Sequence, residues 1–314
     1  MRGIKVNILF CSVGRRAELL KNFKKSLRER VKIVATDNTS IAPALYFADK
    51  AYIVPKIYTD GYIDLILDIC KKEAIQAVTT LIDPEIELLA KNRSKFKSIG
   101  VEVLAPYEQT AKLCYDKFKM YEYLKFNGIA TPRTFGDLDS FNVALSSGNI
   151  SFPVFVKPRT GSGSVGARRI ANISELSFDI KENPSLIIQE CMNGLDLDAD
   201  VYVDTISHKP ISVFSKKKLS TTIGGANKTI SFKDAALFET IKEIINKFEF
   251  NGPIDMDFFH QDGKYYLSEI NPRFGGGYLH AHGAGVDFVQ LIENNINKHC
   301  HNQNLIINLN IFNI

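Results

Sequence analysis

Short apolar runs and segments of helical periodicity alternate along the first hundred residues. The apolar runs predict buried strands at 6–11, 31–36, 77–81 and 101–104. Between them, apolar positions three or four residues apart predict helices at 15–29, 63–72 and 84–91. Strands that alternate with helices indicate a parallel, doubly wound sheet, in which ligands bind beyond the carboxyl ends of the strands. Gly14, Asp37 and Asp83 lie at such ends.

The pattern changes after about residue 106, where a new unit is expected to begin. Residues 110–127 have the spacing of one long helix, which Gly128 closes and Pro132 prevents from resuming. Three further strands are predicted at 154–157, 167–170 and 186–189, and the first of them enters a loop rich in glycine and serine.

The last third has the pattern of an antiparallel sheet. Strands are expected at 201–206 and 210–214, followed by a loop rich in Lys, Ser, Thr and Gly at 215–228 and a helix at 234–248. The segments 254–259 and 264–269 alternate in polarity around a Gln-Asp-Gly turn, which is typical of a hairpin. The segment after His299 predicts at most a weak last strand. We therefore expect three units, at 1–105, 106–189 and 190–314.

Composition narrows the class of protein only slightly. The 314 residues are 45% hydrophobic and 24% charged, which is enough apolar material for more than one core. A net charge of +4 does not call for a nucleic acid or membrane partner, although a phosphate site would use part of it.

Cysteine usage and hydropathy favour a cytoplasmic protein. Five cysteines, with no C-x-x-C pair, fit free thiols in a reducing compartment. No signal-peptide pattern and no run of eighteen apolar residues is found. The stretch His299-Cys300-His301 could suggest a metal, but a solvated tail is the favoured interpretation because nothing at zinc spacing accompanies it.

Oxygen-bearing side chains gather on the predicted hairpin. Asp257 belongs to its first strand, and Glu269 and Asn271 share one face of the second because they are two residues apart. Carboxylate and amide oxygens suit magnesium held between protein and phosphates. Arg273 continues the same period and could contact a phosphoryl group. The alternative is an ordinary hairpin whose outer face is polar because it is exposed to solvent. The full string from Ser268 to Gly277 disfavours this alternative.

A glycine-rich loop follows directly after Lys157. Its backbone N–H groups can approach phosphates closely, while the lysine adds charge. The lysine precedes the glycines, so this is not a G-x-x-x-x-G-K-[ST] loop, and a flexible surface hairpin stays an alternative.

Three weaker signals accompany these two. The strand end at 189–194, with Asp196 after it, could present backbone groups to a base and an acid to a ribose. Asp116-Lys117 lies in a helical stretch, where a solvated lysine is the ordinary interpretation. The run 216–218 could bind anions beside the glycine pair 224–225, or form a solvated face.

In this order, the segments resemble the ATP-grasp superfamily, and most of all the stand-alone proteins that look like half of the carbamoyl-phosphate synthase large subunit. The resemblance extends to about Gly285. It rests on the stretches 12–16, 42–49, 81–85, 155–159 and 269–278, and the last, EINPRFGGGY, is the most specific. It implies a fold of mixed α/β and α+β class: a pre-ATP-grasp sheet at 1–105, a small lobe with a lid loop at 106–189, and a large lobe with the metal site at 190–314.

The resemblance also implies a role for each matched position. Arg273 and Lys157 would be the catalytic residues: Arg273 would face the transferred phosphoryl group, and Lys157 would contact the ATP phosphates. Mg²⁺, for which Mn²⁺ can substitute, would be held by Asp257, Glu269 and Asn271. The residues implied to bind ATP are Lys117, Lys157, Gly161, Ser162, Gly163, Ser164, Gly166, Glu190, Cys191, Met192 and Asp196.

Two departures from the family bear on the substrate. The family usually has Glu where Asp196 stands, and it has arginines where this chain has Lys216 and Lys218, with another near Thr222. Lysine keeps the charge but lacks the planar fork that grips a carboxylate, so the acceptor could differ from that of the relatives.

The function that the resemblance implies is an ATP-dependent ligase that joins a small-molecule carboxylate to an amine through an acyl phosphate. A kinase that releases a phosphorylated small molecule, or an ATP-binding regulatory subunit without turnover, stays an alternative. An oxidoreductase is disfavoured because the first turn lacks G-x-G-x-x-G. His280 and His282 follow the glycine run, where packing or exposure is favoured over substrate contact. A homodimer is left open.

Overall fold

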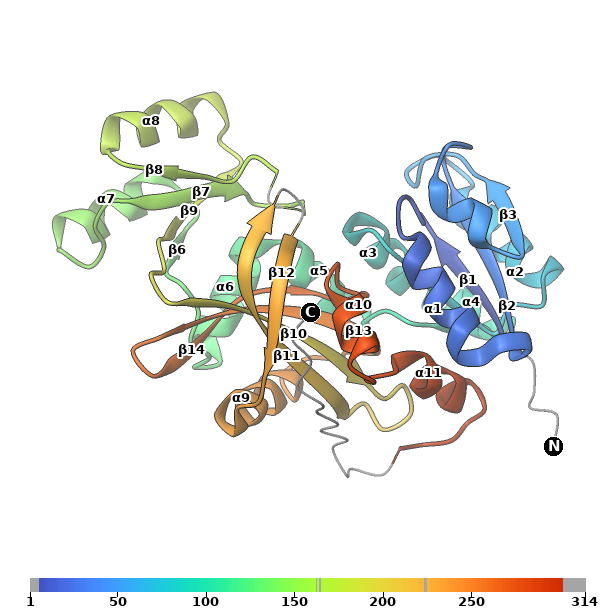
Figure 1. Cartoon of the computed structure of the whole chain (residues 1–314). Helices are drawn as coiled ribbons and strands as arrows, with labels where there is room; N and C mark the ends of the chain where they lie inside the picture. Colours follow the sequence, from blue (N-terminus) through green and yellow to red (C-terminus); the bar gives the residue numbers. More distant parts are fainter. Residues whose placement is uncertain (1–5, 162, 164, 223–224, 302–314) are drawn as a thin grey trace.

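The computed structural model describes residues 6–161, 163, 165–222 and 225–301, and their strands form three sheets (Figure 1). One sheet is parallel and belongs to the N-terminal part of the chain. The other two are antiparallel and lie on the opposite side of the molecule (Figure 1). The mixed fold class predicted from the sequence is confirmed.

The parallel sheet has the strand order β3-β2-β1-β4-β5. Its strands are β1 (Val6–Cys11), β2 (Val31–Asp37), β3 (Lys50–Ile53), β4 (Ala77–Thr80) and β5 (Glu102–Val103). The four predicted strands are all present. The sequence pattern missed β3 because this edge strand is mostly exposed and carries no buried apolar run.

Helices cover both faces of this sheet, as expected for a doubly wound arrangement. They are α1 (Ala17–Leu27), α2 (Tyr62–Lys72), α3 (Asp83–Lys91) and α4 (Arg93–Ser98), with short 3₁₀ turns at Arg28–Arg30 and Pro43–Phe47. Helix α1 buries Leu19, Leu20, Phe23 and Leu27 at helical spacing, which is why the periodicity of this segment predicted it.

A small antiparallel sheet has the order β6-β9-β7-β8. Its strands are β6 (Thr134–Phe135), β7 (Val154–Pro158), β8 (Arg168–Ile170) and β9 (Leu186–Glu190). The helices α7 (Leu138–Ser146) and α8 (Ile173–Glu182) contribute Phe141 and Leu176 to its core. The two helices were not predicted.

The larger antiparallel sheet has the order β12-β11-β10-β13-β14. Its strands are β10 (Leu195–Val203), β11 (Pro210–Thr222), β12 (Gly225–Phe232), β13 (Gly252–Gln261) and β14 (Lys264–Asn271). The helix α9 (Ala235–Ile245) packs its apolar face on the sheet. The predicted hairpin at 254–269 is confirmed and is longer than expected.

The predicted loop at 215–228 is wrong, because most of this segment belongs to β11 and β12. The two strands pair through partners such as Lys216 with Ser231 and Lys218 with Thr229. Lysines at alternate positions hide the strand pattern. In the sequence, a lysine that is paired inside the fold cannot be distinguished from a lysine exposed to solvent.

The single helix predicted at 110–127 is also wrong. The structure has two helices, α5 (Glu108–Tyr115) and α6 (Lys117–Phe126), with extended backbone at Asp116 between them. The Asp116 carboxylate accepts hydrogen bonds from the backbone N–H groups of Phe118 at 3.1 Å and Lys119 at 3.0 Å. Asp116 is thus the N-cap of a new helix rather than an interior residue.

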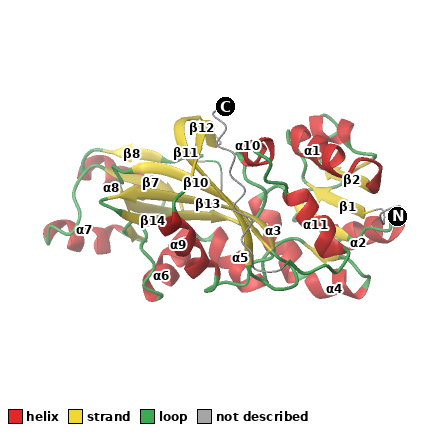
Figure 2. Cartoon of the chain, turned by 60° about the horizontal axis from the view of Figure 1, so that its bottom comes forward, coloured by secondary structure: helices red, strands yellow, loops and turns green. Residues whose placement is uncertain are grey.

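The helices α10 (Tyr278–Gly283) and α11 (Phe288–Ile296) return from the large sheet to the parallel one, where α11 lies near α1 (Figure 2). Arg30 makes a bidentate ion pair with Glu293 on α11, at 2.8 and 3.0 Å. The weak strand expected after His299 falls mainly on residues outside the described ranges.

Candidate active site

Four strands of the large sheet present charged side chains on one face. Register places Lys216, Asp198, Asp257 and Glu269 in one row across β11, β10, β13 and β14. Because side chains two residues apart point the same way, neighbouring rows carry the other charged residues of this face. These are Asp196, Asp200, Lys218 and Asp255, and the uncharged Asn271 lies opposite Asp255.

A cavity of about 670 Å³ lies between this face and the small sheet. Its size is that of a small-molecule or cofactor site. Phe155, Val165 and Phe259 provide apolar walls. The predicted site residues that line the cavity are Lys117, Lys157, Gly161, Glu190, Met192, Asp196, Asp257 and Glu269.

The other predicted site residues that the structure describes do not line this cavity. Asn271 and Arg273 lie deeper, towards the parallel sheet, while Cys191, Gly163 and Gly166 are not among the described residues that line the cavity. Ser162 and Ser164 fall outside the described residues. Their roles stay predictions.

Lys117 and Lys157 approach the cavity from different elements. Lys157 is half-buried at the end of β7, and desolvation lowers its pKa, while the nearby charge of Glu269 acts in the opposite direction. Lys117 is the first residue of α6, and its Nζ donates to the Gly161 carbonyl oxygen at 2.5 Å. The break at Asp116 therefore positions Lys117 against the glycine-rich loop. Lys117, which the sequence indicated only weakly, thus lines the cavity.

A second contact anchors this loop to the helix break. Arg159 Nε lies 2.8 and 2.9 Å from the two carboxylate oxygens of Asp116. The backbone N–H of Lys117 also donates to the Arg159 carbonyl oxygen at 3.0 Å. Asp116 thus caps α6 and at the same time holds the residues that lead into the loop.

Asp257 and Glu269 pair across the hairpin and supply the acidic side of the cavity. Lys218 Nζ lies 2.5 Å from Asp257 Oδ1, and Lys117 Nζ lies 3.6 Å from Glu269 Oε1. Desolvation raises the pKa of Asp257 to about 6, against the opposing charge of Lys218. Asn271 donates its amide to Asp257 Oδ2 at 3.4 Å. Two carboxylates and an amide beside each other are a donor set that fits Mg²⁺.

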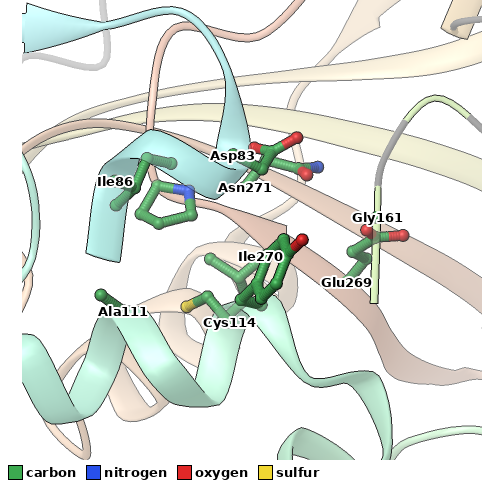
Figure 3. Close-up of a pocket in the computed structure, with 10 residues that line it drawn as sticks. Asp83, Ile86, Ala111, Cys114, Gly161, Glu269, Ile270 and Asn271 are labelled. Carbon is green, nitrogen blue, oxygen red and sulfur yellow. The ribbon is translucent and has the colours of Figure 1, made fainter. Parts of the chain in front are cut away.

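Arg273 does not line the cavity but pairs with Asp83 at the start of α3. Its Nε lies 2.8 Å from Asp83 Oδ1, and its guanidinium also donates to the Phe274 carbonyl oxygen at 3.1 Å. Figure 3 shows Asp83 close to Asn271, beside a small hollow that Glu269 also lines. The contact of Arg273 with a phosphoryl group therefore stays a prediction, and its present partner is a carboxylate of the parallel-sheet unit.

A buried charge cluster next to the cavity was missed by the sequence reasoning. Lys216 is fully buried, with its Nζ 2.5 Å from Asp200 Oδ2 and 3.2 Å from Asp198 Oδ1. Asp255 lies in the same cluster. Desolvation by itself lowers the pKa of Lys216, but Asp198 and Asp200 outweigh this and the pKa is raised. A solvated face is thus the wrong interpretation for Lys216, and the D-x-D-x-D pattern at 196–200 was the available signal.

The glycine run 275–277 passes directly over this cluster. A Cβ on Gly275 would lie 2.7 Å from Asp255 Oδ1, and one on Gly277 would lie 2.7 Å from Lys216 Nζ. Arg16 of the first strand-to-helix turn donates to the carbonyl oxygens of Phe274 at 3.0 Å and Gly275 at 2.7 Å. Desolvation, followed by the repulsion from Arg273, lowers the pKa of Arg16 to about 10.

Three residues predicted to contact the base and the ribose, Glu190, Met192 and Asp196, line the cavity. Glu190 ends β9, and its Oε1 accepts a hydrogen bond from the Arg133 backbone at 2.7 Å. Asp196 Oδ1 lies 2.9 Å from Lys218 Nζ. Met192 lines the cavity beside them.

The two histidines after the glycine run make protein contacts. His282 Nε2 is 3.0 Å from Ser26 Oγ on α1, and His280 Nδ1 is 2.7 Å from Thr229 Oγ1 on β12. The ring of His280 also packs edge-on against Phe214. These contacts agree with the favoured packing interpretation.

Comparison with known proteins decides the family. The model of the ATP-grasp domain matches residues 114–277, just over half of the chain. The chain belongs to the ATP-grasp family. The N-terminal domain of PylC-like proteins also matches, at residues 8–104, which is the part that forms the parallel sheet. The family predicted from the sequence is confirmed.

Sequence relatives of this ATP-grasp chain are distant. The carbamoyl phosphate synthase large chain of Thermoplasma acidophilum is 22% identical over 278 residues, which cover 79% of this chain and 25% of that protein. The D-alanine–D-alanine ligase of a Nitratiruptor species is 31% identical over 144 residues, covering 40% of this chain and 41% of the ligase. The chain thus spans about a quarter of the length of the carbamoyl phosphate synthase relative.

Solved structures share the whole fold. The biotin carboxylase domain of Hydrogenobacter thermophilus 2-oxoglutarate carboxylase, in complex with MgADP, superposes with a TM-score of 0.72 at 18% identity, covering 94% of this chain and 70% of that one. The L-amino acid ligase of Bacillus licheniformis gives a TM-score of 0.70 at 16% identity, covering 93% of this chain and 74% of that one.

None of the helices in the described part of this chain combines the length and apolar character needed to cross a bilayer.

Proposed function

We propose that the protein is an ATP-dependent carboxylate–amine ligase that forms ADP and phosphate. One observation carries the proposal: Lys117 and Lys157 face Asp257 and Glu269 across a single cavity in an ATP-grasp fold. Lysines opposite carboxylates suit a nucleotide whose phosphates are bound together with a metal ion. The ligase of Bacillus licheniformis and the D-alanine–D-alanine ligase are similar proteins whose names describe this class of reaction.

The proposed chemistry follows from the absence of a good leaving group on a carboxylate. It is a poor acylating agent, so the terminal phosphoryl group of ATP would pass to a carboxylate oxygen, giving an acyl phosphate and ADP. An amine then attacks the acyl carbon and displaces phosphate. Phosphoryl transfer needs alignment and charge neutralisation rather than a protein nucleophile.

The chain's own residues would supply that alignment. In the proposal, Lys117 and Lys157 bind the phosphates, and the glycine-rich loop at 161–166 excludes water. Asp257, Glu269 and Asn271 would hold Mg²⁺, which supplies additional positive charge against the phosphates. Glu190 to Met192 would lie at the base and Asp196 at the ribose. Arg273 would release its ion pair with Asp83 and contact the transferred phosphoryl group instead.

The remaining proposals concern setting and organisation. We infer the units 1–105, 106–189 and 190–314, small-molecule carboxylate and amine substrates, no nucleic acid or membrane partner, and a cytoplasmic setting that supplies ATP. A homodimer stays open. We infer that the parallel-sheet unit, the segment 216–228 and the region after Gly277 determine the specificity for the acceptor. Their sequence does not reveal the substrate, because fold alone does not determine function.

The test is an ADP-release screen over amino acids and small carboxylates, with and without amines. We expect release to require one carboxylate and Mg²⁺, and Glu269→Ala to abolish it. Glu239→Ala, which removes an exposed carboxylate paired with Lys242, is the control. If Glu269→Ala releases ADP as fast as the wild type, the assignment of the site is wrong.

Phosphorus NMR of the products separates the ligase from a kinase. The ligase releases free phosphate only when an amine is present. A stable phosphorylated product that accumulates whether or not amine is added would replace the ligase with a kinase. Absence of turnover with every pair, together with tight ADP binding, would favour a regulatory subunit.

A further inference from the structure

Both carboxylates proposed as metal ligands are paired with a lysine from another part of the chain. Lys218 extends from β11 and lies 2.5 Å from Asp257 Oδ1, and its side chain is 13% exposed. Lys117 begins α6 and lies 3.6 Å from Glu269 Oε1, with a side chain 11% exposed. Two lysines that line the cavity, Lys117 and Lys218, are therefore already paired with its carboxylates.

The contact at Asp257 is much the closer of the two. Lys218 also lies 2.9 Å from Asp196 Oδ1, so one ammonium group bridges two carboxylates. Ammonium–carboxylate attraction strengthens as solvent is excluded, and this pair is largely shielded from water. A divalent cation that binds Asp257 has to compete with this ammonium group for the same oxygens.

The neighbouring Lys216 is an ammonium group of the same sheet that is held permanently in its ion pairs. It lies two residues before Lys218 on β11, so its side chain points to the same face. It is fully buried and pairs with Asp200 and Asp198. Lys218 differs because it lines the cavity, as do Asp196 and Asp257. It can therefore leave Asp257 for a ligand that enters the cavity, whereas Lys216 cannot.

Resting on the function proposed above, we propose that Lys218 is an internal counter-ion that occupies the cation position at Asp257 and yields it only when metal and nucleotide arrive together. A metal ion alone must break the Lys218–Asp257 pair, the shorter of the two contacts, and leave the ammonium group with Asp196 as its remaining carboxylate partner. A nucleotide phosphate supplies a new partner for that group. Metal and nucleotide consequently bind with positive coupling, and neither the free metal nor the free nucleotide binds well alone.

Binding of Mn²⁺, followed by the electron paramagnetic resonance signal of the free ion, tests this without any turnover. In the nucleotide-free protein, Lys218→Met removes the competitor, so Mn²⁺ affinity should rise about tenfold. Lys218→Arg keeps the pair and should stay near the wild type. With ADP present, the gain in Mn²⁺ affinity should be large for the wild type and smaller for Lys218→Met.

Two further variants show where the extra affinity arises. Lys157→Met removes a positive charge from the same cavity, but among the described residues Lys157 makes no ion pair within 4.0 Å, so a general field effect is all it should reveal. Combining Lys218→Met with Asp257→Asn should abolish the gain, because the freed carboxylate is then absent.

The outcomes separate this inference from the proposed function. If the wild type binds ADP with Mg²⁺ but Lys218→Met leaves Mn²⁺ affinity unchanged or weaker while its melting temperature is retained, the counter-ion role is wrong and the ATP site stands. An equal rise in Lys157→Met would also overturn it, since the field would then explain the effect. A wild type that binds no ADP at any Mg²⁺ concentration overturns both.

Discussion

At the residue scale, the glycine run meets the buried charge cluster at close range. A Cβ on Gly275 would approach Asp255 to 2.7 Å, whereas one on Gly276 would meet nothing within 4 Å. We expect Gly275→Ala to destabilise the protein by roughly 1–3 kcal/mol, because a tightly packed region has to shift to accept a methyl group. Urea unfolding measures the change. Gly276→Ala is the matched control, and equal effects of the two would contradict the packing argument.

A second residue-scale prediction concerns acid stability. Asp204 is buried directly after β10, and desolvation favours its protonated form. Hydrogen bonds from Asn295, at 2.8 Å, and from the backbone of Ser207, at 2.7 Å, outweigh this, so the pKa of Asp204 lies well below its usual value. A carboxyl whose pKa is lowered on folding stabilises the protein above its unfolded pKa, and this contribution is lost as the pH falls towards the folded value.

The unfolding free energy should therefore fall more steeply for the wild type than for Asp204→Asn between about pH 5 and pH 3. Urea titrations at fixed pH values provide the measurement. Asp68→Asn, which removes an exposed carboxylate paired with Lys71, should leave the slope unchanged. Parallel slopes for the wild type and Asp204→Asn would show that Asp204 is not the titrating group.

At the element scale, the break between α5 and α6 joins a helix cap to the glycine-rich loop. Asp116 caps α6 and pairs with Arg159. Asparagine caps helices about as well as aspartate but cannot form the ion pair. We expect Asp116→Asn to retain stability and to weaken ADP binding by about three- to tenfold, because the loop and Lys117 lose their common anchor.

Asp116→Ala separates the two roles. Besides the weaker ADP binding, it should lower the unfolding free energy by about 1 kcal/mol, since the cap is lost as well. Calorimetric titration with ADP and urea unfolding measure the two effects. Wild-type ADP affinity in Asp116→Asn would mean that the ion pair does not position the loop.

At the scale of the whole molecule, the parallel sheet and the large sheet share one apolar core. Phe274 lies in an edge-on contact with Phe23 of α1 and with Tyr278 of α10, and it is 1% exposed. Arg273 and Asp83, and Arg16 with the carbonyl oxygens of Phe274 and Gly275, join the same units through polar contacts. The two parts should therefore unfold together.

Phe274→Ala should lower the unfolding free energy by roughly 3–5 kcal/mol, through lost burial and an unfilled cavity. Hydrogen exchange followed by mass spectrometry should show faster opening in β1 and in β13 alike. Leu279→Ala, at a position 43% exposed, is the control. Faster exchange in one strand only would show that the units are energetically separate.

Much of the fold was predictable because local patterns and packing agree. Buried apolar runs predicted β1, β2, β4 and β5, and the alternation around the Gln-Asp-Gly turn predicted β13 and β14. The pairing of Asp257 with Glu269 across that hairpin follows from the same alternation. The glycines and serines that follow Lys157 also indicated the loop that borders the cavity.

The sequence by itself determined the family and most of the strands, and it singled out the carboxylates of the proposed metal site, because each depends on residues close together in the chain. Only the tertiary structure decided how charges pair across the chain. Lys216 and Lys218 look like a solvated run until β10 and β13 bring Asp198, Asp200 and Asp257 beside them. Arg159, the nearer ionic partner of Asp116, likewise lies 43 residues away. A side chain's type states which charge it can carry, but the distance to its partner, which sets the strength of their attraction, exists only in the folded chain.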